Sequence, residues 1–173
     1  VTLLQIRNEV ERMSGLVREN LRLSMDALLA GKVADAKQIE ENETVIDYLT
    51  DAISDYLVKL NVREMSDRDA QYVNHVFQAL SDLERIGDYA EHLQQLTEQQ
   101  DEKGVSYTQP AMTELKTITD NAVDLFDRAV AAFYQQNIHL DELKRMAKTQ
   151  RLIRKLTTQS QLNHMERLRT GEC

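Results

Sequence analysis

The chain has 173 residues, of which 42% are hydrophobic, 29% are charged and 5% are aromatic, and its formal net charge is -8. The acidic excess argues against a nucleic-acid backbone as the main partner, and the single cysteine, Cys173, excludes a disulfide within the chain. One proline and five glycines leave few residues that interrupt helices. These properties predict an all-α protein built from a few long helices.

Two amphipathic helices are expected first. Apolar residues at three- and four-residue steps predict a helix over residues 2–30, which Gly31 ends, and a second helix over 33–60. Four acids at four-residue steps run beside the apolar stripe of the second helix: Glu43, Asp47, Asp51 and Asp55. A helix turns by about 100° per residue, so this row drifts by about 40° at each step. Only Glu43 and Asp47 are therefore expected to lie near the contact with a neighbouring helix.

Residues 66–101 are predicted to form a third helix, with Ser66 as its N-cap. Glu84 and Asp88, four residues apart, lie at the edge of its apolar stripe, where like charges repel by about a few tenths of a kcal/mol. Paired carboxylates suit a hard divalent cation, whereas a solvated acidic face is the alternative. His92 continues the row and is either a third ligand or a surface histidine. Gly87 is unfavourable inside a helix and predicts the close approach of a neighbouring helix.

A break in periodicity over residues 102–110 precedes a fourth helix, whose first turn suits Pro110. A fifth helix is predicted over 140–169. When the chain is aligned with itself at a shift of 107 residues, Ile46 pairs with Ile153, and the first two helices align with the last two. The chain therefore divides into a three-helix repeat over 1–103 and a two-helix partial repeat over 108–173, whose third helix is missing. Exposed apolar residues on the last two helices, such as Leu152 and Leu156, predict a homodimer.

The fifth helix is basic, unlike the rest of the chain. From Asp141 to Cys173 there are eight lysine and arginine residues against four acids. This helix is expected either to meet anionic lipid, an acidic partner or phosphate, or to pair with acids of its own bundle.

The stretch Leu83-Glu84-Arg85-Ile86-Gly87-Asp88, followed by Ala90, resembles the signature of the PhoU family. The resemblance implies an antiparallel helical bundle of three-helix repeats, a regulatory role in phosphate uptake and no enzymatic activity. It also implies metal binding by an acid followed four residues later by Asp, here Glu84 and Asp88. Together with Glu43, Asp47 and His92, these residues form the predicted site for a divalent ion, which is Fe, Mn, Mg or Zn. Asparagine is commoner in the family at the position of His92.

Residues 163–173 resemble the PhoU-like domain at the C-terminus of bacterial sodium/phosphate cotransporters. That resemblance implies a domain cut from a longer chain, whose membrane portion is its partner, at the cytoplasmic face of the inner (plasma) membrane. No apolar run reaches the roughly 18 residues that a membrane span needs, and the first residues carry no signal-peptide pattern. The alternatives are a stand-alone regulator of phosphate uptake and a helical interaction module that binds no metal. A di-metal enzyme would use Glu-x-x-His pairs, which the sequence lacks.

Overall fold

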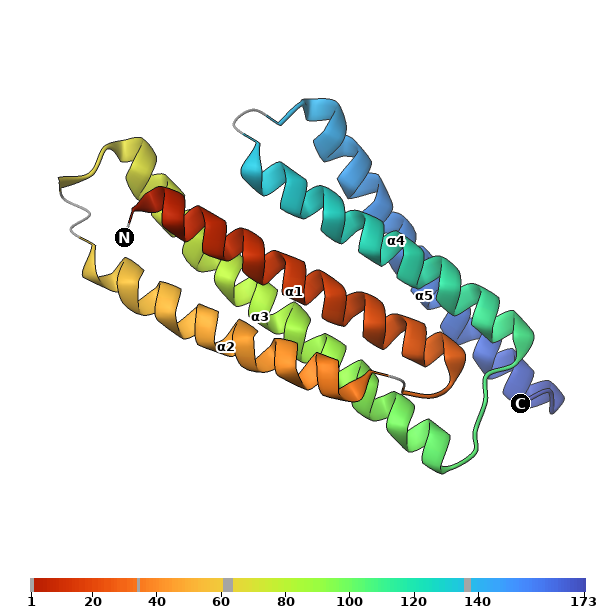
Figure 1. Cartoon of the computed structure of the whole chain (residues 1–173). Helices are drawn as coiled ribbons and strands as arrows, with labels where there is room; N and C mark the ends of the chain where they lie inside the picture. Colours follow the sequence, from red (N-terminus) through yellow and green to blue (C-terminus); the bar gives the residue numbers. More distant parts are fainter. Residues whose placement is uncertain (1, 34, 61–63, 136–137) are drawn as a thin grey trace.

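The described part of the chain is an antiparallel bundle of α-helices (Figure 1). The computed structural model describes residues 2–33, 35–60, 64–135 and 138–173. Its helices are α1 (Leu3–Ala30), α2 (Ala36–Lys59), α3 (Asp67–Glu102), α4 (Gln109–Tyr134) and α5 (Leu140–Thr170). The all-α fold is confirmed, and each helix lies where the periodicity predicts it, with ends that differ by at most a few residues.

The helix ends follow from local sequence. Thr2 and Gln5 form a capping box at the start of α1, and the Ser66 side chain accepts a hydrogen bond from the Asp69 backbone at the start of α3. Such caps satisfy backbone N–H groups that have no partner inside the helix. At the other end of α1, Gly31 takes the left-handed conformation with φ of 72°, which glycine adopts without steric cost.

The main core lies between α1, α2 and α3. The apolar stripes predicted for these helices point inward, and Met13, Val17, Ile46 and Val76 are fully buried. Each buried side chain of this size contributes about 1.5–3 kcal/mol relative to its exposed state. Apolar packing therefore holds α2 against α3.

The last two helices are less enclosed. α4 packs on α1 through Val123 and the Arg18–Asp127 ion pair, whose atoms are 2.7 Å apart. α5 packs on α4, and Arg167 is the one buried residue of α5 within the described chain. Leu152 is 42% exposed and Leu156 is half-buried. This exposure agrees with the expectation of uncovered apolar residues, while the homodimer and the division at residues 103–108 stay predictions.

One carboxylate joins α4 to α5. Arg167 donates from Nη1 and Nη2 to the two carboxylate oxygens of Glu114, at 3.0 and 3.3 Å. Ser160 and Asn163 donate to the same oxygens at 2.7 and 2.9 Å. The Arg167 hydrogen bonds are the largest cause that lowers the pKa of Glu114 to about 2. Four donors from α5 therefore converge on one acid of α4.

We predict that Glu114→Gln loosens the pairing of α4 with α5. The substitution removes charge-assisted hydrogen bonds from a mostly buried guanidinium, so amide hydrogen exchange along α5 should become about tenfold faster. Glu166→Gln is the matched control, because Glu166 makes an exposed ion pair with Arg169 on the same helix. Equal exchange rates in the two variants would contradict the role given to Glu114.

Candidate functional site

The most unusual contact in the bundle joins an acid of α2 to a glycine of α3. Glu43 is only 7% exposed, and its carboxylate lies directly against Gly87. A Cβ atom at position 87 would lie 2.9 Å from Oε2 and 3.1 Å from Oε1 of Glu43. The close approach predicted at Gly87 is present, and the group that approaches is this carboxylate. A side chain at position 87 would therefore force the Glu43 carboxylate, the end of a flexible side chain, to shift.

The surroundings of Glu43 disfavour its charged form. Neither carboxylate oxygen has a hydrogen-bond partner within the described chain. Burial is the largest cause that raises the pKa of Glu43 to about 7, followed by the negative charges of Asp47, Asp88 and Glu91. The Asn20 side chain lowers the pKa of Glu43 and so opposes this rise. The amide nitrogen of Asn20 donates its hydrogen bond to the Ile39 carbonyl, at 3.0 Å.

A buried amide network holds the helices beside this carboxylate. Asn42 donates to Oδ1 of Asn20 at 2.9 Å, and Gln38 donates to Oδ1 of Asn42 at 3.0 Å. Asn20 is fully buried and Asn42 is 5% exposed. Satisfied buried networks of this kind fix the alignment of neighbouring helices. Asn20 was not predicted to be a site residue, although its position three residues after Val17 on the apolar stripe was a signal for it.

The acidic cluster consists of Glu43 and Asp47 on α2 and of Asp88 and Glu91 on α3. Three of these residues were predicted site residues, and the fold brings them within electrostatic range of one another. Glu91 was missed, although it lies one helical turn after Gly87 and therefore on the same face of α3. Two predicted residues fall outside this cluster, because neither Glu84 nor His92 is among the charges that shift the pKa of Glu43. Glu84 is half-buried, and His92 is exposed, as Asp47 and Asp88 also are.

The acidic cluster is not a preformed set of metal ligands. Among the described residues, no three His, Cys, Asp or Glu side chains are already arranged as a ligand set. A closed tetrahedral zinc site needs four such ligands. Mg²⁺, in contrast, keeps several waters and uses one or two carboxylates. Glu43 has two carboxylate oxygens without a hydrogen-bond partner in the described chain, and carboxylate oxygens are the ligand atoms that an ion of this second type uses.

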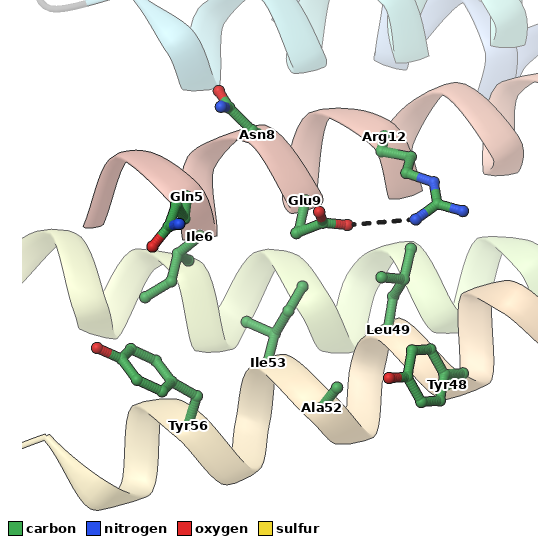
Figure 2. Close-up of a pocket in the computed structure, with 10 residues that line it drawn as sticks. All are labelled: Gln5, Ile6, Asn8, Glu9, Arg12, Tyr48, Leu49, Ala52, Ile53 and Tyr56. Carbon is green, nitrogen blue, oxygen red and sulfur yellow. Dashed lines mark ion pairs between the residues drawn. The ribbon is translucent and has the colours of Figure 1, made fainter. Parts of the chain in front are cut away.

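A separate cavity of about 460 Å³ lies between α1 and α2. Figure 2 shows Tyr48 and Tyr56 on α2 flanking an apolar floor that includes Ile53, opposite an ion pair on α1. That pair joins Arg12 to Glu9 with an N–O distance of 3.5 Å. None of the residues of the acidic cluster lines this cavity.

The raised pKa of Glu43 predicts a pH-dependent stability in metal-free buffer. Because the folded pKa of about 7 lies above the ordinary glutamate pKa of 4.5, the contribution of protonated Glu43 is complete below pH 4.5 and is lost as the pH rises through 7. Wild type should lose on the order of 2 kcal/mol over this range relative to Glu43→Gln. Urea unfolding at several pH values measures the difference, and Asp51→Asn, an exposed acid of the same helix, should behave like wild type.

A second prediction concerns Gly87. Alanine in a helix interior is favoured over glycine by about 1 kcal/mol, so Gly87→Ala should stabilise a Glu43→Ala protein by about that amount. In the wild-type background the added methyl group collides with Glu43, and the gain should shrink or reverse. Gly15→Ala is the control, because nothing lies within 4 Å of its added Cβ. If Gly87→Ala gives the same gain in both backgrounds, Glu43 does not occupy the space beside Gly87.

Comparison with known proteins identifies the family. Over 143 residues the chain is 28% identical to a phosphate-specific transport system accessory protein PhoU homolog from Synechocystis, covering 82% of this chain and 62% of that protein. Over 135 residues it is 25% identical to the accessory protein PhoU of Edwardsiella tarda, covering 78% and 54% respectively. The chain thus spans between half and two thirds of the length of these relatives. No solved structure matches it significantly. The family model for the PhoU domain matches residues 10–97, which include the whole acidic cluster, and the chain therefore belongs to the PhoU family.

Proposed function

We propose that this chain is a regulator of phosphate uptake of the PhoU type, which acts as an accessory protein to a phosphate transport system and not as an enzyme. The observation that carries the proposal is the family match over residues 10–97. The names of both relatives, which are accessory proteins of phosphate-specific transport, support it. They favour a stand-alone regulator over a domain fused to a transporter.

The acidic cluster is the proposed regulatory site, and its ligand is a divalent cation. Glu43 would hold the ion from α2, with Asp88 from α3, and Asp47 and Glu91 would add negative charge beside it. A bound cation supplies a positive charge that offsets these acids, so Glu43 would be held ionised. Because its ligands come from α2 and α3, occupancy of the site would strengthen the contact between the two helices. Glu84 and His92 remain candidates for contacts with the ion beyond its direct ligands.

A cotransporter domain is the second candidate, because residues 163–173 resemble that class of protein. In this case the partner is a membrane portion of the same chain, and the site of action is the cytoplasmic face of the plasma membrane. None of the helices in the described ranges is long and apolar enough to cross a membrane.

Deleting the gene in its host tests the regulatory role. We expect the deletion to change the rate of phosphate uptake and the wild-type gene to restore it. Uptake that is unaffected at both low and high external phosphate would refute the proposal. Fractionation of the full gene product separates the two candidates, because a fused domain sediments with membranes after a high-salt wash and a stand-alone accessory protein is released.

Melting curves with and without Mg²⁺ or Mn²⁺ test the metal site. A ligand at 100 times its Kd stabilises the folded state by about 2.7 kcal/mol. Wild type should gain stability of this order, whereas Asp88→Asn should lose the gain and be unchanged or slightly more stable without metal, since repulsion among the acids is relieved. Asp51→Asn is the control.

Equal metal stabilisation in wild type and Asp88→Asn would place the ion elsewhere. No stabilisation in either protein would favour the helical interaction module without metal.

A further inference from the structure

A basic cavity lies at the end of the bundle where α1 and α3 begin and α4 ends (Figure 1). Its volume is about 280 Å³, and its lining includes Arg7, Arg68, Tyr72, His75 and Tyr134. Neither aspartate nor glutamate is among the described residues that line it. This is unexpected in a chain with 29 acidic and 21 basic residues. The cavity therefore has the electrostatic character of an anion site on an acidic protein.

The two arginines of the cavity are not neutralised by carboxylates. Among the described residues, neither Arg7 nor Arg68 takes part in an ion pair. Arg7 lies over the ring of Tyr134, 5.4 Å from its centroid, and donates to the Tyr134 carbonyl at 3.4 Å. These contacts hold the guanidinium in place and leave most of its N–H groups available, because a guanidinium carries five donors.

A tyrosine hydroxyl beside Arg7 also lacks a partner. The hydroxyl of Tyr72 is buried and makes no hydrogen bond within the described chain. Burial raises the pKa of Tyr72, and the positive charge of Arg7 opposes that shift, so the two side chains are close. A buried hydroxyl without a partner is unfavourable, and an acceptor oxygen between Tyr72 and Arg7 would satisfy it.

We propose that this cavity binds a phosphoryl group, held by the guanidinium groups of Arg7 and Arg68 with Tyr72 and His75 as further hydrogen-bond donors. Two positive charges match a phosphate dianion, and planar guanidinium groups bind its oxygens in pairs. A carboxylate has only two oxygens and one charge, so it would leave donors unused. The phosphoryl group can come from free phosphate or from a lipid headgroup, and both sources offer the same chemistry.

The phosphoryl site is independent of the acidic cluster and of the proposed function. Arg68 and Gly87 are 19 residues apart on α3, which corresponds to roughly 28 Å along the helix axis. A substitution at one site therefore leaves the contacts of the other intact, and the two sites can be tested separately.

Isothermal titration calorimetry with inorganic phosphate, at constant ionic strength, measures binding to the whole chain. We expect saturable binding that weakens at least about tenfold in Arg7→Gln and in Arg68→Gln, since each loses a charged bidentate donor. Tyr72→Phe should weaken it several-fold. The matched control is Arg85→Gln, which should bind like wild type. Arg85 is an exposed arginine of the same helix and makes no ion pair with any residue that the structure describes. Circular dichroism verifies that each variant remains helical.

Vesicles of phosphatidylcholine, with and without phosphatidic acid, identify the source of the phosphoryl group. Saturable binding of free phosphate indicates a soluble ligand. Binding only to vesicles that contain phosphatidic acid, lost when Arg7 and Arg68 are both replaced by Gln, indicates a lipid headgroup. The proposal is overturned if wild type binds neither probe, or if the double variant binds as tightly as Arg85→Gln.

Discussion

The contact between the Glu43 carboxylate and Gly87 constrains the centre of the bundle. Neither oxygen of Glu43 has a hydrogen-bond partner within the described chain, and apolar residues that include Ile46 and Leu83 pack in the core between α2 and α3. The fold therefore keeps an acid in a place that favours its neutral form. The cost of that arrangement is largest when Glu43 is charged, and a proton or a cation lowers it.

This constraint explains why the acids on α2 are not equivalent. Glu43 and Asp51 occupy the same four-residue row, but the row drifts around the helix by about 40° at each step. Glu43 consequently lies in the contact with α3, whereas Asp51 is exposed. Like charges gathered around one buried carboxylate destabilise each other without a counter-charge. If the proposed cation binds the acidic cluster, the α2–α3 contact would respond to cation concentration in a way that a contact between apolar residues cannot.

Periodicity alone predicted the helices and their buried faces, because a stripe such as Val73, Val76 and Leu80 encodes the inward side directly. It also placed Glu43, Asp47 and Asp88 near a helix contact. It could not predict that Glu84 would stay out of the cluster and that Glu91 would enter it, because that depends on how α3 is rotated against α2. Relative rotation is set by side-chain packing between the two helices, which no single-helix pattern contains.

The basic cavity could not be predicted from the sequence, for a related reason. Arg7 lies on α1, while Arg68 and His75 lie about two helical turns apart on α3. These three residues form no charge run, whereas the basic residues of α5 do form one. Yet Lys148, Arg151 and Lys155 of α5 are exposed along a helical surface. Arg7, Arg68 and His75 are exposed as well, but they line one cavity together with the half-buried Tyr72. Positive charges that converge on one cavity attract an anion more strongly than the same charges spread along a helix. α3 therefore carries an acidic cluster near its middle and a basic cavity at its start, and the separation of roughly 28 Å exceeds the screening length of about 8 Å at physiological salt. Each site can consequently keep its own charge preference on one continuous helix.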